Sequence, residues 1–242
     1  MSSGAYREDL AYVHDAGFLG LAENAAPVLL EELRRGGPGR GLVVDLCCGS
    51  GPLSRELSDA GYDVLGVDVS GAMVRMAMER VPEGRFVEGS VFALDLPPCV
   101  AVAAVGECIN YLFDEGNTRG ALEGLLRRIH EALRPGGVLL FDFAGPGRAP
   151  GPTKSHAEGD GWAVLATAEE DPEQGILTRR ITTFRKVGEA YRRDEEVHRL
   201  RILDPKPMIE ELRGLGFRVR VLEGYGGLRF PPGLVGLLAR KA

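Results

Sequence analysis

One short stretch, residues 42–52, limits the folds open to this chain more than any other; it reads Leu-Val-Val-Asp-Leu-Cys-Cys-Gly-Ser-Gly-Pro. An apolar, partly β-branched run that ends in a carboxylate is typical of a buried strand. Two glycines, Gly49 and Gly51, follow, and then a proline that suits the first turn of a helix. Strand, glycine loop and helix predict the opening of a nucleotide-type βαβ unit, in which a ligand contacts backbone at the glycines.

A second strand, residues 63–68, follows the predicted helix 53–60 and ends in Asp68. The spacing from Asp45 is that expected for a strand-end acid that accepts hydrogen bonds from the ribose hydroxyls of an adenosine. The alternative is that Asp68 is an ordinary turn residue at the end of a strand.

The charge at the first loop indicates which adenosine cofactor is bound. Asp45 directly precedes the loop, where its carboxylate would repel a pyrophosphate and attract a cation. Position 54, which is the third glycine of a dinucleotide fingerprint, is Ser54. S-adenosylmethionine (SAM) carries a sulfonium and an ammonium and no phosphate, so these residues favour SAM over a nicotinamide dinucleotide.

With these features the chain resembles the class I SAM-dependent methyltransferases of the small-molecule type, whose first motif is acid-x-Gly-x-Gly-x-Gly. Asp45, Gly49 and Gly51 match it, and Cys47 replaces the first glycine, which a thiol tolerates if the backbone φ there is negative. The resemblance covers essentially the whole chain. It implies an α/β, Rossmann-like, doubly wound seven-stranded sheet, with the last strand antiparallel and a small antiparallel β insertion.

The resemblance also implies a set of cofactor contacts. Asp68 should hold the ribose, and Asp45 should lie beneath the ammonium or order the loop. The turn at residues 89–91 should edge the adenine, with Ser90 in place of the usual acid. The residues expected to bind SAM are Tyr6, Tyr12, Asp45, Cys47, Gly49, Gly51, Asp68, Val69, Met73, Gly89, Ser90, Val91 and Glu107.

Pattern and resemblance together divide the chain into four parts. These are an N-terminal helical lid at 1–36, a cofactor-binding core at 37–150, an antiparallel β insertion over the acceptor pocket at 151–203, and the C-terminal part of the core sheet at 204–242. The insertion is expected to hold three strands, 161–169, 176–186 and 189–202, after a flexible loop at 144–155. We also expect a tight turn at 134–137 before the fifth strand and a loop at 224–233.

The expected reaction is in-line methyl transfer from SAM to the N or O of a small-molecule acceptor. A base is required only if the acceptor arrives protonated, and the candidates are Glu107, His198 and His14. Asn110 or Tyr111 would approach the acceptor. Two other functions stay open: a SAM-binding protein without turnover, and an NAD-dependent oxidoreductase.

The composition limits the kinds of partner and the cellular location that we expect for this chain. The formal net charge of −6 argues against a nucleic-acid partner. No apolar run is long enough to span a bilayer and no signal pattern opens the chain, so we expect a cytoplasmic protein with no membrane partner and leave a homodimer open. The four cysteines, Cys47, Cys48, Cys99 and Cys108, are interpreted as small buried hydrophobes that form neither a disulfide framework nor a zinc site.

Overall fold

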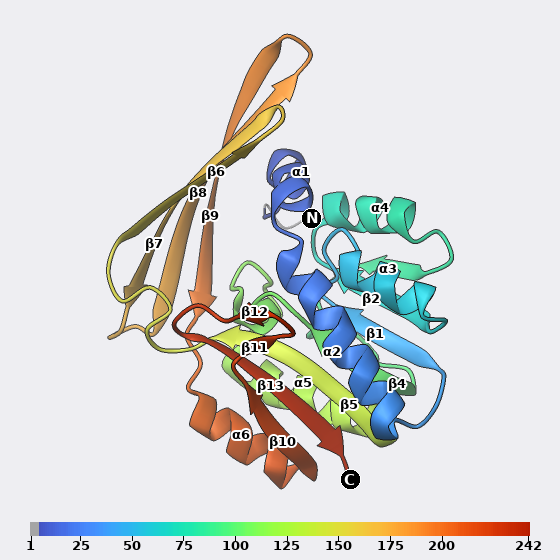
Figure 1. The fold of residues 1–242 in the computed structure, drawn as a ribbon. Coiled ribbons are helices and arrows are strands. Elements are labelled where there is room, and N and C mark those ends of the chain that lie inside the picture. The colour runs from blue at the N-terminus through green and yellow to red at the C-terminus, as the bar shows by residue number, and fades with distance from the viewer. Residues whose placement is uncertain (1–4) are drawn as a thin grey trace.

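A seven-stranded sheet forms the centre of the computed structural model, which describes residues 5–242 (Figure 1). The strand order is β10-β13-β5-β4-β1-β2-β3, and β13 runs antiparallel to both of its neighbours. The predicted sheet, with its last strand antiparallel, is therefore confirmed. The strands are β1 (Leu42–Leu46), β2 (Asp63–Asp68), β3 (Arg85–Glu88), β4 (Cys99–Ala104), β5 (Leu133–Ala144), β10 (Phe217–Leu222) and β13 (Leu234–Lys241).

Helices cover both faces of this sheet. Because side chains alternate along a strand, Val43 packs with α2 and α3 on one face while Val44 packs with α5 and α6 on the other. α4 packs beside the β3 edge, on Phe86. The helices are α1 (Glu8–Gly17), α2 (Gly20–Gly36), α3 (Pro52–Asp59), α4 (Gly71–Arg80), the 3₁₀ turn η1 (Cys108–Asn110), α5 (Arg119–Ala132) and α6 (Pro205–Gly214).

The prediction of a separate turn at residues 134–137 is wrong, because α5 ends at Ala132 and β5 begins at the next residue, Leu133. The Pro-Gly-Gly segment instead forms an irregular start to the strand. Gly136 has a φ of +77°, and the pairing of β4 with β5 shifts register between Cys99 and Ala101. The segment 224–233 is likewise not wholly a loop, since β11 (Gly224–Tyr225) and β12 (Leu228–Arg229) pair within it.

A second, four-stranded antiparallel sheet extends away from the central one (Figure 1). Its strands are β6 (Thr153–Gly159), β7 (Trp162–Asp171), β8 (Ile176–Val187) and β9 (Ala190–Arg201). Three were predicted, and the fourth, β6, was placed partly in a loop. β6 is an edge strand of mostly exposed polar residues, so it lacks the alternation of apolar side chains that identifies a strand.

The two sheets meet at the segment that follows β4. Tyr111 forms an isolated bridge with Leu200 of β9, and the amide of Leu112 donates to the carbonyl of Arg199 at 2.8 Å. Asn110 reinforces this junction: its side-chain amide donates to the carbonyls of Ala144 and Arg201 at 3.0 and 2.6 Å and accepts from the amide of Ala144 at 3.0 Å. Asn110 is fully buried and committed to backbone, so the expectation that it approaches an acceptor is wrong.

Over residues 5–242, none of the helices combines the length and apolar character that a bilayer crossing requires.

Replacing Asn110 with alanine removes three hydrogen bonds between its side chain and the backbone of this junction, and one of them is the side-chain acceptor of the buried Ala144 amide. Each hydrogen bond contributes about 1 kcal/mol, and a buried group that loses its partner costs about 1–3 kcal/mol. We therefore expect Asn110→Ala to lower the free energy of unfolding by about 3 kcal/mol or more, measured by urea denaturation. Asn24→Ala is the control, because Asn24 makes a single hydrogen bond to Gly20 within α2 and should cost about 1 kcal/mol or less. Equal losses in the two variants would contradict this account of the junction.

Candidate active site

A cavity of about 100 Å³, here called the strand-end cavity, lies beyond the carboxyl ends of β1, β2 and β4. This is the edge of an open α/β sheet at which ligands bind. The cavity is lined by Tyr6, His14, Cys47, Gly49, Asp68, Val69, Met73, Val105, Gly106, Cys108, Tyr111, Phe113 and Asp114.

The glycine loop after β1 brings backbone to this cavity. Gly49 has a φ of +54°, and a Cβ built on it would point into open space. Gly51 has a φ of +80° and precedes α3, where a Cβ would lie 3.1 Å from Ala77. Gly49 therefore faces the cavity, whereas Gly51 serves the packing of α3 against α4.

Cys47 corrects two expectations. Its φ is +53°, in the left-handed region that glycine adopts most readily, so the expected negative φ is wrong. Cys47 also forms a disulfide with Cys108 of η1, with the two Cα atoms 5.7 Å apart. The interpretation of all four cysteines as unpaired hydrophobes is thus wrong for this pair, and it holds for Cys48 and Cys99, which are buried free thiols.

The two strand-end acids differ in position. Asp68 lines the cavity and accepts from the amides of Gly49 at 3.0 Å and Ser70 at 2.9 Å; burial raises its pKa to about 6. Asp45 is buried outside the cavity lining and accepts from the Ser54 hydroxyl at 2.7 Å, and burial raises its pKa to about 7. Asp45 therefore connects β1 to α3 rather than facing a ligand.

A second carboxylate reaches the cavity from an unexpected place. The Ser90 hydroxyl donates to Asp114 at 2.9 Å, and Asp114 lines the cavity while Ser90 does not. A Cβ on Gly116 would come within 2.5 Å of the Ser90 oxygen, so a glycine there lets the two loops meet. The carboxylate of Asp114 therefore lies next to Ser90, the position at which the methyltransferase motif usually has an acid. Nothing local in the sequence signals this contact, because the two residues are 24 positions apart.

The polar groups of the strand-end cavity fit a cationic nucleoside. Among the described residues that line it are two aspartates and neither lysine nor arginine. Neither Asp45 nor Asp68 forms a salt bridge in the described part of the chain. A sulfonium or an ammonium is favoured by these charges, whereas a pyrophosphate would lack a cationic partner.

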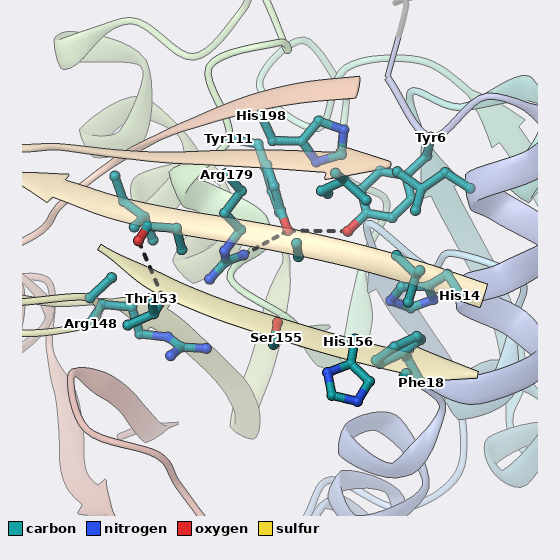
Figure 2. A pocket seen from close by; sticks show the side chains of 18 residues that line it. Tyr6, His14, Phe18, Tyr111, Arg148, Thr153, Ser155, His156, Arg179 and His198 are labelled. Carbon is teal, nitrogen blue, oxygen red and sulfur yellow. Dashed lines mark hydrogen bonds between the residues drawn. The ribbon is translucent and has the colours of Figure 1, made fainter. Parts of the chain in front are cut away.

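A larger cavity of about 400 Å³, here called the insertion cavity, lies between the four-stranded sheet and the N-terminal segment (Figure 2). Tyr6, His14 and Tyr111 line both cavities, so these three residues mark the place where the two cavities meet. The other residues lining the insertion cavity are Leu10, Phe18, Arg148, Ala149, Thr153, Ser155, His156, Ala157, Val164, Ala166, Ala168, Leu177, Arg179, Ile181 and His198.

Glu196 orients His198 beside Tyr6 and Tyr111, where the two cavities meet. His198 is buried, and its Nε2 lies 2.8 Å from a Glu196 carboxylate oxygen. Because a carboxylate accepts, Nε2 carries a proton, so in the neutral imidazole the lone pair is on Nδ1. Nδ1 has no hydrogen-bond partner among the described residues. Glu196 was not predicted as a site residue, although its spacing of two from His198 on a strand puts both on one face.

The same carboxylate fixes the N-terminal segment. The amides of Tyr6 and Arg7 donate to Glu196 at 2.6 and 2.8 Å. The Tyr6 ring then lies 4.9 Å from the His198 ring, and its hydroxyl lies 3.2 Å from that of Tyr111. Further along, buried Asp9 pairs with Arg192 of β9. The segment that begins at Tyr6 is therefore attached to the four-stranded sheet while it covers the strand-end cavity.

His14 projects from α1 toward both cavities (Figure 2). Burial lowers its pKa to about 4, so the imidazole is neutral near pH 7. Its Nδ1 has no hydrogen-bond partner among the described residues. A neutral imidazole of this kind can orient an N–H or O–H group, although its low basicity makes it a poor final proton acceptor.

Glu107, the third candidate base, is part of an ion-pair cluster. Its carboxylate pairs with Arg148 at 2.7 Å and with Arg179 at 2.6 Å. Burial raises the pKa of Glu107, but the two guanidiniums lower it by more, so its net pKa lies below the ordinary value. Glu107 lies outside the described lining of both cavities, and this geometry argues against its proposed roles as base and cofactor contact.

The structure brings together about half of the predicted cofactor set. Tyr6, Cys47, Gly49, Asp68, Val69 and Met73 line the strand-end cavity. Tyr12 instead lies beneath the Arg185 guanidinium, 3.9 Å from its ring centroid, facing the four-stranded sheet. Also outside the described lining are Asp45, Gly51, Gly89, Ser90, Val91 and Glu107. The residues of that lining absent from the predicted cofactor set are His14, Val105, Gly106, Cys108, Tyr111, Phe113 and Asp114.

Comparisons with known proteins agree with this geometry. Residues 43–137 match the family described as "Methyltransferase domain". YqeM of Bacillus subtilis (strain 168), whose name identifies a methyltransferase without a stated substrate, is 26% identical over 196 residues, 75% of each chain. Trans-aconitate 2-methyltransferase of Paracidovorax citrulli is 37% identical over 105 residues, which are 42% of this chain and 38% of the relative.

Solved structures share the complete fold. The sugar N-methyltransferase KedS8 from Streptoalloteichus sp. has a TM-score of 0.74 and 23% identity, with 96% of this chain and 92% of KedS8 covered. The family match, the relatives and the shared fold support a class I SAM-dependent methyltransferase. The same findings support SAM as the cofactor.

The raised pKa of Asp45 predicts a pH dependence of stability. At pH values between about 4 and 7 the folded chain retains a proton that the unfolded chain has lost, so this carboxyl makes the fold less stable as the pH rises. We expect the stability of the wild type relative to Asp45→Asn to fall by on the order of 2 kcal/mol between pH 5 and pH 7. Chemical denaturation at a series of pH values measures it.

Asp63→Asn, at the exposed start of β2, controls for the loss of a carboxylate from the same sheet. Parallel stability curves for the wild type and Asp45→Asn over this pH range would show that the buried carboxyl does not titrate as described.

Proposed function

We propose that this methyltransferase transfers the methyl group of SAM to an N–H or O–H group of a small polar acceptor bound in the insertion cavity. The observation that carries the proposal is that Tyr6, His14 and Tyr111 line both cavities, so a donor in one and an acceptor in the other would meet at these residues. KedS8 is named as a sugar N-methyltransferase, and the Paracidovorax relative is named for trans-aconitate, which fits an acceptor of this size.

For the cofactor, Asp68 would accept hydrogen bonds from the ribose hydroxyls, and Asp114 beside Ser90 would lie near the adenine. Gly49 would let the methionine portion approach the backbone. When bound, SAM supplies an activated methyl group on a positively charged sulfur. The chain then contributes mainly alignment of the acceptor and exclusion of water, which together lower the barrier of such a displacement.

His198 is the proposed general base. Glu196 holds its Nε2 proton, which leaves the lone pair of Nδ1 available and stabilises the imidazolium that forms. His14 and the hydroxyls of Tyr6 and Tyr111 would orient the acceptor. Burial raises the pKa of both tyrosines, so they remain protonated hydrogen-bond donors. In this proposal residues 5–36 act as the lid and residues 151–203 form the roof; residues 1–4 of the predicted lid lie outside the described residues.

The proposal is tested by incubating the full chain with methyl-labelled SAM and a panel of amino sugars, polyols and hydroxy acids. With any acceptor that is methylated, we expect His198→Asn to lower kcat by about 10²-fold or more, because a positioned base contributes 10²–10⁴-fold. The affinity for SAM should be unchanged. Arg199→Gln, exposed on the opposite face of β9, is the matched control and should retain wild-type rates.

If the protein binds SAM but transfers methyl to no member of a panel covering amines, hydroxyls and carboxylates, the result would favour a SAM-binding protein without turnover. If His198→Asn retains the wild-type kcat and its pH profile, His198 is not the base.

A further inference from the structure

We infer that the acceptor carries an anionic group, a carboxylate or a phosphate, that binds at the Arg148 end of the insertion cavity. This inference rests on the proposed function, because it assigns one end of the same acceptor. It begins from the unused hydrogen-bond donors of Arg148. The Nε of Arg148 donates to Glu107 at 2.7 Å, whereas both of its Nη atoms have no hydrogen-bond partner among the described residues.

The net charge of the cluster supports an anion. One buried carboxylate, Glu107, pairs with two guanidiniums, Arg148 and Arg179, so these three side chains carry a net charge of +1. The nearby Glu170 carboxylate accepts from the backbone amides of Gly147 and Ala149 and pairs with neither guanidinium in the described part of the chain. Among the described residues that line the insertion cavity there is neither aspartate nor glutamate to balance it. A positive charge in a partly buried cavity attracts an anionic ligand more strongly than the same charge in water does.

The geometry also separates this charge from the place of transfer. Figure 2 shows Tyr6, His14 and His198 toward one end of the cavity and Arg148 with Thr153 toward the other. An acceptor with an anionic group at Arg148 would thus present its other end to the three residues shared with the strand-end cavity. Arg179 is less available than Arg148, because both of its Nη atoms already donate to Glu107 and one of them also donates to the Tyr111 hydroxyl.

Binding of small anions tests this without turnover. Inorganic phosphate and citrate are titrated separately into the full chain saturated with S-adenosylhomocysteine, and binding is measured by calorimetry. We expect at least one anion to bind, and Arg148→Gln to weaken it by about tenfold or more, as loss of a charged hydrogen-bonding group does. Arg180→Gln is the control. Arg180 follows Arg179 on β8 and is exposed on the face opposite to that of Arg179, so this variant should bind the anion as the wild type does.

The phosphate and citrate arms separate the two anion chemistries. If neither anion binds at millimolar concentrations, or if Arg148→Gln binds equally well, the inference is overturned, and the proposed methyl transfer stands or falls separately on the labelled-SAM assay. Unchanged affinity of Arg148→Gln for S-adenosylhomocysteine confirms that the variant is folded.

A second, independent observation concerns the cofactor. We propose that Cys47 and Cys108 are a reversible redox pair whose disulfide closes the SAM site. Both cysteines line the strand-end cavity, and their bond joins the loop after β1 to the turn after β4 across the edge where the ligand binds. In this disulfide-bonded state the cavity is about 100 Å³, whereas sites for ligands of this kind are about 300–1,000 Å³.

The chemistry needs only a small disulfide as oxidant. The two thiols lose two protons and two electrons, an S–S bond forms between Cys47 and Cys108, and the bond of the small disulfide breaks to give two small thiols. The neighbouring Cys48 does not readily replace either cysteine in this exchange, since burial raises the pKa of its thiol well above the usual range. Reduction would release the two loops and allow the cleft to widen.

The test compares the full chain treated with dithiothreitol and with oxidised glutathione, with the Cys47–Cys108 linkage checked by peptide mass spectrometry. We expect S-adenosylhomocysteine to bind the reduced protein at least about tenfold more tightly. Cys108→Ser should abolish the difference between the treatments whatever its own affinity, while Cys99→Ser should keep it. Equal affinity of both wild-type states, or no linkage under excess oxidant, would overturn the proposal.

Discussion

The carboxylate of Glu196 is the contact on which the arrangement of this site depends. It accepts hydrogen bonds from the backbone of Tyr6 and Arg7 and from the ring of His198, and it is itself buried. One side chain of the four-stranded sheet therefore places the N-terminal segment over the strand-end cavity and also selects which nitrogen of His198 bears the proton. A buried charge of this kind is stable only because several donors surround it.

Electrostatics divides the remaining site into two compartments. The described residues that line the strand-end cavity include aspartates but no lysine or arginine. Those that line the insertion cavity include Arg148 and Arg179 but no aspartate or glutamate, and both arginines pair with buried Glu107. The first suits a sulfonium nucleoside, and the second suits an acceptor of opposite charge. Neutral groups, the two tyrosine hydroxyls and the imidazole of His14, lie between them.

The sequence predicted the central sheet and the first loop well, because both follow from local patterns. The buried strand before Gly49 and the acid that ends the next strand are separated by a short helix, so their spacing alone places Gly49 and Asp68 together. Contacts between distant segments left no such signal. Asp114 meets Ser90 through a close approach at Gly116, Glu196 meets Tyr6 across 190 residues, and Cys47 meets Cys108 across 61. The polar edge strand β6 was missed for a different reason, since exposed residues impose no alternation.

The central claim is that SAM and the acceptor meet where Tyr6, His14 and Tyr111 line both cavities. A crystal structure of the reduced protein with S-adenosylhomocysteine tests it most directly. The account predicts the ribose hydroxyls on Asp68 and the sulfur facing these three residues. A ligand whose sulfur points away from the insertion cavity, or whose ribose lies away from Asp68, would contradict it.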